Sequence, residues 1–188
     1  MKKSRTRIVL LVLLLAVVGI QFIPVDRSNP TSNPDEDFIA VAQLSPEISV
    51  KLKQACFDCH SNYSRYPWYS YVAPSSFFVA NHIKEGREEL NFSVWTTYST
   101  KKQIHKLEEC IEALREGWMP LDSYVLMHNE ADLSTEDRNA MATEMENVLA
   151  TIKAEVKNSG ASEMNESHDD HEHEHEHEHE HEGEHSHE

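Results

Sequence analysis

Residues 56–60 of the chain read Cys-Phe-Asp-Cys-His, and these five residues decide how the rest of the sequence is interpreted. Two cysteines at this spacing can each add a thiol to one of the two vinyl groups of a haem. The histidine that follows directly can then meet the iron on the same side of the macrocycle. Cys-x-x-Cys-His is the attachment sequence of a c-type haem. We therefore expect Cys56 and Cys59 to hold one covalent haem c and His60 to be its proximal iron ligand.

Two other chemistries use closely spaced cysteines, and the surrounding sequence favours neither. A thioredoxin-like redox pair needs a βαβ context, but no alternation of strand and helix patterns flanks residues 56–60. A zinc site needs two further ligands at finger-like spacing, whereas His82, His105 and His128 are widely separated. Cys110 is left unpaired, and we expect it to be a small buried thiol on a helix face, with a sensor or nucleophile role as the alternative.

Length and charge restrict the class of protein. The chain has 188 residues and a formal net charge of −16. Ten acidic groups lie in residues 168–188, which contain no Lys or Arg, so the rest of the chain accounts for only −6 of that charge. About 120 residues remain between the two ends, which is a usual size for one domain. No basic stripe is available to neutralise phosphates, so we expect no nucleic-acid partner.

The N-terminus has the pattern of an exported protein. An apolar run over residues 8–20 follows four cations, Lys2, Lys3, Arg5 and Arg7. Continuing the run to Val25 gives 18 residues, just enough to span a bilayer, and no good small-residue cleavage site follows. We predict a single-pass anchor over residues 1–25 in the inner (cytoplasmic) membrane, with the C-terminal domain facing the periplasm. A cleaved signal peptide is the alternative.

Breakers and helix signals divide the remaining chain. Residues 26–44, rich in Pro, Asn, Ser and Asp, predict a linker. Residues 45–157 predict the haem domain, in which Ser-Pro-Glu at 45–47 opens a helix. Further helices are expected over 76–90, 100–116 and from 134 onward. No strand of period two is present, so the fold class is all-α.

A haem held by His60 has one axial position left. Met119 precedes Pro120, which restricts the backbone and can aim a flexible thioether at one place, so Met119 is the predicted distal ligand. The alternatives are Met127, His128 and His82. Two other features concern the surroundings of the haem. Five aromatic residues between Tyr63 and Pro74 are expected to cover the haem or cap the protein core, and Met141 and Met145 are expected to be core residues.

Together these residues resemble the haem-binding domain of small exported bacterial proteins, a divergent relative of class I cytochromes c. The resemblance covers residues 45–155 and is carried by Cys-Phe-Asp-Cys-His-Ser-Asn at 56–62, Pro-Trp-Tyr-Ser at 67–70, His-Ile-Lys-Glu-Gly-Arg at 82–87, Leu-Asn-Phe-Ser-Val-Trp at 90–95 and Met-Pro at 119–120. It implies one covalent haem in a cytochrome c-like helical domain with His60 proximal. In cytochromes c a Met-Pro pair before the last helix usually carries the distal ligand, which supports Met119. The resemblance implies no reaction.

The C-terminal tail, residues 158–188, repeats His-Glu six times over residues 171–182. Imidazoles at alternate positions can bind Zn, Ni or Cu, and the candidate ligands are His171, His173, His175, His177, His179 and His181. The alternative is a solvated acidic tail or an engineered tag without a metal role. With or without a metal role, the segment is too polar to bury a core, so we expect the tail to be disordered.

The leading functional hypothesis is a membrane-anchored electron carrier, not an enzyme, that exchanges single electrons with an unidentified redox partner protein. One alternative is a haem peroxidase or a gas or redox sensor with an open or displaceable sixth ligand. Another is divalent-metal buffering through the His/Glu tail.

Overall fold

The computed structural model describes residues 2–158, and every regular element in that range is helical. The α-helices are α1 (Lys2–Ile20), α2 (Phe38–Ala42), α3 (Pro46–Ala55), α4 (Phe57–His60), α5 (Ser75–Glu89), α6 (Thr100–Glu116), α7 (Asp122–Val125) and α8 (Thr135–Asn158). The 3-10 helices are η1 (Pro34–Glu36), η2 (Trp68–Tyr71), η3 (Phe92–Thr97) and η4 (Asn129–Ala131). The predicted all-α class is confirmed.

Local signals set the bounds of the main helices. The Ser45 hydroxyl accepts a hydrogen bond from the Ile48 N–H at 3.4 Å, so α3 starts at Pro46 as expected for this N-cap. Helix α6 ends at Gly117, which has a φ of +78° and donates its N–H to the Ala113 carbonyl at 3.0 Å. A residue without a Cβ adopts this left-handed conformation at low cost.

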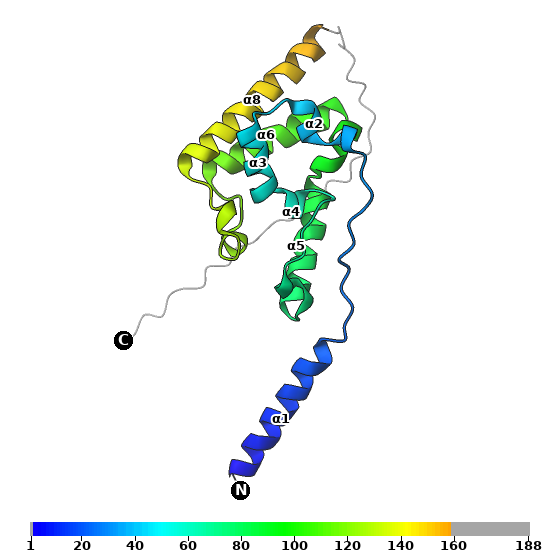
Figure 1. Ribbon diagram of the computed structural model, residues 1–188, viewed down its shortest axis with the longest axis vertical. Coiled ribbons are helices and arrows are strands. Elements are labelled where there is room, and N and C mark those ends of the chain that lie inside the picture. The colour runs from blue at the N-terminus through cyan, green and yellow to red at the C-terminus, as the bar shows by residue number, and fades with distance from the viewer. Residues whose placement is uncertain (1, 159–188) are drawn as a thin grey trace, which may run out of the picture.

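The core lies where α6 and α8 pack along each other with α3 against α8 (Figure 1), and buried residues of η3 belong to the same cluster. Met141 and Met145 of α8 are 0% and 1% exposed, which confirms that they are core residues. Leu107 of α6 and Leu52 of α3 are buried in the same cluster. These helices therefore form the rigid frame that carries the shorter helix α4.

Part of the segment predicted to be a linker is folded instead. Phe38 of α2 is fully buried, and its ring lies 5.3 Å from Phe92 and 4.8 Å from Trp95, centroid to centroid. The Asp37 carboxylate caps α2 by accepting from the Ile39 N–H at 2.9 Å. The domain thus begins before residue 45, because the short apolar run after Asp37 packs into the core.

The predicted membrane span over residues 1–25 is not found. Among residues 2–158, no helix is both long and apolar enough to cross a membrane. Helix α1 stops at Ile20. Residues 21–25, which are part of the 18-residue apolar stretch that predicted the span, lie outside this helix. The apolar run of residues 8–20 is about 20 Å long at 1.5 Å per residue, shorter than a hydrocarbon layer of about 30 Å.

The predicted tail, including its candidate metal ligands from His171 to His181, lies outside the described residues except for Asn158.

Candidate haem site

One cavity of about 590 Å³ lies in the middle of the helical domain. Its volume is in the range of roughly 300–1,000 Å³ that is usual for cofactor sites. Residues from four parts of the chain line it, among them Cys56, Cys59, His60, Gly86 and Met119. The structure therefore places the three residues of the attachment sequence in the wall of one cavity.

A single helical turn points these three residues the same way. The Cys56 carbonyl accepts hydrogen bonds from the Cys59 N–H at 3.2 Å and from the His60 N–H at 2.9 Å. Residues three and four positions apart are neighbours on one face of a helix. The spacing of the motif thus brings two thiols and one imidazole to the same side of α4.

The surroundings of His60 select one form of its ring. Its Nδ1 lies 2.8 Å from the Gly86 carbonyl oxygen and 3.1 Å from that of Leu90. Carbonyl oxygens only accept hydrogen bonds, so Nδ1 carries the proton and Nε2 is left as the basic nitrogen. Burial lowers the pKa of His60, which also favours the neutral ring. A neutral imidazole with an orienting bond on its other nitrogen is the usual form of a metal ligand.

Gly86 allows α5 to approach α4 closely enough for these bonds. A Cβ at this position would lie 2.8 Å from the Cys59 carbonyl oxygen and 3.0 Å from the Cys59 Cβ. Such distances are sterically prohibited, so a side chain here would push the two helices apart. In the sequence, Gly86 stands out only as one residue of the motif His-Ile-Lys-Glu-Gly-Arg at 82–87. Its packing role is visible only in the structure.

The cysteines do not have the environment of a thiol redox pair. All three cysteines are free. Burial raises the pKa of Cys56 to about 12 and that of Cys59 to about 11. Reactive dithiols need the opposite shift, because the thiolate is the nucleophile. The zinc alternative also lacks support, since residues 2–158 contain no group of three or more His, Cys, Asp or Glu placed to hold a metal ion.

Two of the four candidates for the distal ligand line the cavity. Met119 and His82 do so, whereas Met127 is 51% exposed and His128 stacks on the Tyr124 ring at 4.1 Å outside the lining. His82 lies on α5, the helix whose Gly86 carbonyl contacts Nδ1 of His60. If His60 bound the iron of a haem, a second ligand would have to come from another wall of the cavity.

Met119 comes from such a wall. It lies between α6 and α7 in the chain, whereas His60 and its partner Gly86 lie on α4 and α5. The guanidinium of Arg138 on α8 donates one hydrogen bond to the Met119 carbonyl and another, of 3.3 Å, to the Leu133 carbonyl. Arg138 thus ties the loop to a long helix. No sequence signal pointed to Arg138. Met145, which was expected only as a core residue, also lines the cavity.

The prediction that the aromatic loop covers the haem is wrong. None of the aromatic residues between Tyr63 and Pro74 lines the cavity, and Trp68 is 73% exposed. The aromatic rings in the lining belong to Phe92, Trp118 and Tyr124. The loop instead forms η2 and packs beside the start of α5, because its two prolines and the short 3-10 turn carry it away from α4.

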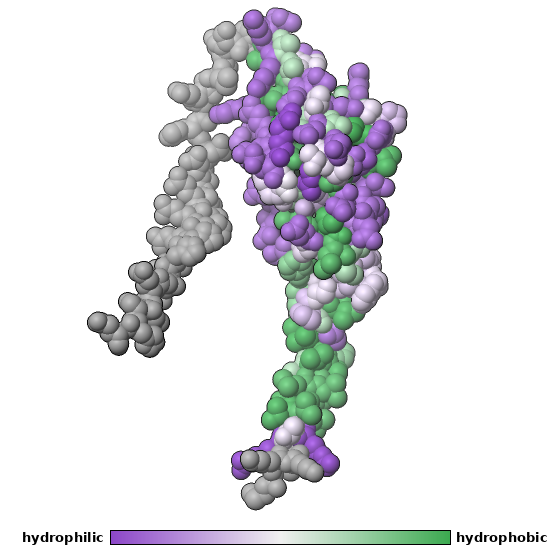
Figure 2. Space-filling model, turned by 90° about the vertical axis from the view of Figure 1, so that its left-hand side faces the viewer, coloured by the Kyte–Doolittle hydropathy of each residue, from purple (hydrophilic) through white to green (hydrophobic). Residues whose placement is uncertain are grey.

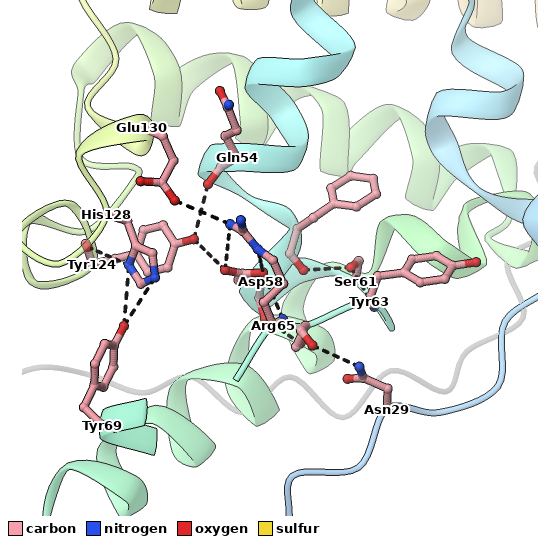
Figure 3. Close-up of polar contacts among 12 residues, drawn as sticks. Asn29, Gln54, Asp58, Ser61, Tyr63, Arg65, Tyr69, Tyr124, His128 and Glu130 are labelled. Carbon is pink, nitrogen blue, oxygen red and sulfur yellow. Dashed lines mark hydrogen bonds and ion pairs between the residues drawn. The ribbon is translucent and has the colours of Figure 1, made fainter. Parts of the chain in front are cut away.

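A buried carboxylate connects the attachment sequence to the cavity wall (Figure 3). Asp58 is 6% exposed and accepts three hydrogen bonds of 3.1 Å from Arg65, one from its backbone N–H and two from its guanidinium. The Tyr124 hydroxyl, whose ring lines the cavity, lies 2.8 Å from the other side of this carboxylate. Burial and the Asp58 charge raise the pKa of Tyr124, so it stays a neutral donor.

Comparison with known proteins adds an independent finding. A family model described as a haem-binding domain matches residues 15–147. No curated protein and no solved structure matches the chain. The matched range contains α4, Gly86, Met119 and Arg138. A cavity with two thiols, an oriented imidazole and a thioether in its wall fits a haem, and the chain belongs to the haem-binding domain family.

Proposed function

We propose that this haem-binding domain carries its haem covalently, as haem c, and transfers single electrons on the exported side of the cytoplasmic membrane. The observation that carries the proposal is the state of His60. Its Nδ1 is occupied by two backbone carbonyls, so the basic Nε2 is left at a cavity whose wall also holds both thiols. An imidazole prepared in this way serves iron ligation better than it serves proton transfer.

Each thiol has one task. The sulfurs of Cys56 and Cys59 would hold the haem by adding across its two vinyl groups, with one S–C bond at each and the thiol hydrogen transferred to the neighbouring vinyl carbon. Burial raises the pKa of both thiols, so neither is prepared to act as a reactive thiolate in redox exchange. When bound, haem supplies a one-electron couple whose potential is set by its axial ligands and surroundings.

The residue on the side of the haem opposite His60 would distinguish an electron carrier from a protein whose haem binds small molecules. Met119 occupies the wall that His60 does not, and Arg138 holds its backbone. A thioether in this position keeps water and small molecules from the sixth position and raises the reduction potential. This arrangement supports electron transfer over peroxidase or gas-sensor chemistry.

The apolar interior of the cavity contrasts with several charged residues in its lining. Four glutamates and one lysine contribute to it: Glu85, Glu89, Glu109, Glu112 and Lys106. The Lys106 ammonium is 2.8 Å from a Glu109 oxygen and 3.7 Å from a Glu89 oxygen. As the one Lys or Arg in this lining, it is the residue best placed to pair with a haem propionate.

The exported location is supported by the N-terminal pattern of cations followed by an apolar helix. The redox partner is an unidentified protein of the same compartment.

Visible spectroscopy of the purified chain tests the proposal. We expect the alkaline pyridine spectrum of a haem with two thioether bonds, and a six-coordinate, low-spin spectrum in both oxidation states. Haem that is extracted by acidic organic solvent would contradict covalent attachment. A high-spin ferric spectrum with ready binding of cyanide or carbon monoxide would favour the ligand-binding alternative.

A further inference from the structure

Exposed apolar side chains gather at one end of the haem domain, outside the lining of the haem cavity. Trp68 and Tyr71 of η2, Val72 after it and Phe78 of α5 are 73%, 59%, 47% and 53% exposed, and none of them lines the cavity. We refer to these four residues as the aromatic end. A soluble surface seldom leaves so many large apolar groups together without a partner.

The aromatic end lies directly beside the end of α1. The Gln21 side chain bonds both backbone groups of Ala73, donating to its carbonyl at 3.1 Å and accepting from its N–H at 2.9 Å. The Arg27 guanidinium lies 4.5 Å from the centre of the Tyr71 ring and donates to the Ser70 carbonyl at 3.4 Å. These contacts hold the chain that follows α1 against η2 and the start of α5.

The apolar surface continues from the aromatic end onto α1. Phe22 and Ile23, next to Gln21, are 81% and 53% exposed. The large apolar residues of α1 from Ile8 to Val18 are each 47–61% exposed, and residues 8–25 contain no Asp, Glu, Lys or Arg. Figure 2 shows this green surface rising from α1 into the white and green lower end of the domain, while hydrophilic side chains dominate the upper part.

The shape of this surface selects its occupant. A protein groove would cover one face of α1, but residues 8–20 of α1 are apolar on all sides. A helix that is apolar all round needs an apolar medium around it, and lipid provides one. Trp and Tyr are enriched at the boundary between lipid and water, because they combine an apolar ring with one polar group. Trp68 and Tyr71 lie where that boundary falls if lipid surrounds α1.

We propose that the aromatic end is a lipid-contacting surface, with Trp68, Tyr71, Val72 and Phe78 in the head-group region of a bilayer. Contact of this kind does not require α1 to cross the bilayer. It would hold the domain by the end that is opposite to α2 and α3. The proposed haem chemistry does not depend on it, so either can fail without the other.

Depth-dependent quenching with the full chain tests the contact. Vesicles of phosphatidylethanolamine with a minor share of phosphatidylglycerol are prepared with bromine either just below the head groups or near the ends of the acyl chains. Trp68→Phe isolates the emission of Trp68 by difference. We expect vesicles with shallow bromines to quench Trp68 more strongly than vesicles with deep ones. Absence of quenching at both depths would overturn the proposal.

Partitioning measures how much the surface contributes. Trp68→Ser combined with Val72→Ser should lower the vesicle partition coefficient roughly tenfold or more, because about 25 cal/mol of affinity is lost per Å² of apolar contact. Val41→Ser combined with Val50→Ser, on α2 and α3, is the matched control and should change it little, since both residues are exposed apolar groups far from α1. Equal partitioning of the two variants would contradict lipid contact. A lipid-free dimer that only the Trp68/Val72 variant abolishes, with Trp68 unquenched, would identify a second copy as the occupant and overturn it as well.

Discussion

The two walls of the haem cavity are built in different ways. The proximal wall consists of five consecutive residues, 56–60, which form one helical turn closed by bonds to the Cys56 carbonyl. The distal wall combines Met119 from a loop with Arg138, which lies 19 residues further along the chain on α8. Local geometry therefore brings the two thiols and the imidazole together, whereas long-range packing places Met119 in the cavity wall.

The largest expected effect removes the proximal chemistry. Cys56→Ser combined with Cys59→Ser should leave no haem that survives denaturing gel electrophoresis, because no thioether can form. Peroxidase staining of the gel measures this. Cys110→Ser is the control, since it also removes a thiol from the cavity wall but should retain the stain. Stained haem in the double variant would contradict covalent attachment through α4.

A second change tests how α5 supports the proximal wall. Gly86→Ala should lower the free energy of unfolding by about 1–3 kcal/mol, the usual cost of overpacking, because its Cβ would meet the Cys59 backbone at 2.8 Å. Denaturant titration of the haem-loaded chain measures the change. Gly19→Ala is the matched control, as nothing lies within 4 Å of its Cβ position. Equal stability of Gly86→Ala and the unaltered chain would mean that α5 is free to move away from α4.

The distal wall is tested by removing its thioether. Met119→Ala should keep covalent haem but shift the ferric spectrum toward high spin and lower the reduction potential, because a soft sulfur ligand favours the ferrous state. Spectroelectrochemistry measures both quantities. Met127→Ala, which removes an exposed methionine from outside the cavity, should leave both unchanged. If Met119→Ala has no effect and His82→Ala does, the distal ligand comes from α5.

The smallest effect on the haem itself is expected at the support of the distal wall, because Arg138 acts on it only through the backbone of Met119. Arg138→Met removes the bonds to the Met119 and Leu133 carbonyls, and a hydrogen bond from a charged group contributes about 1.5–3 kcal/mol. We expect a partial loss of thioether ligation and a lower midpoint in thermal titrations of the ferric red absorption band. Arg115→Met removes an Arg whose partner is the half-exposed Glu146, and such surface pairs contribute about 0–1 kcal/mol. Identical spectra and midpoints for the two variants would show that Arg138 does not position Met119.

Two errors of sequence-based prediction have the same physical origin. The aromatic residues of the loop over 63–74 were expected to cover the haem or cap the protein core because large rings need apolar cover, yet none of them lines the cavity and Trp68 is 73% exposed. Phe38 was assigned to a linker because polar residues and prolines surround it, yet it is fully buried. The sequence around an aromatic residue predicts that its ring needs an apolar neighbour. It does not identify that neighbour, because tertiary packing determines which residues come into contact.

The sequence by itself determined the grouping of two thiols and one imidazole on a single turn, the all-helical class and the main helix bounds, because each depends on residues close together in the chain. A Cys-x-x-Cys-His turn, the Ser45 cap and the Gly117 terminus are complete within a few residues. Only the tertiary structure decided which partners hold His60 and Met119. The Gly86 and Leu90 carbonyls lie 26 and 30 residues from His60 in the chain. Their approach depends on how α5 packs against α4, and no local pattern encodes that packing.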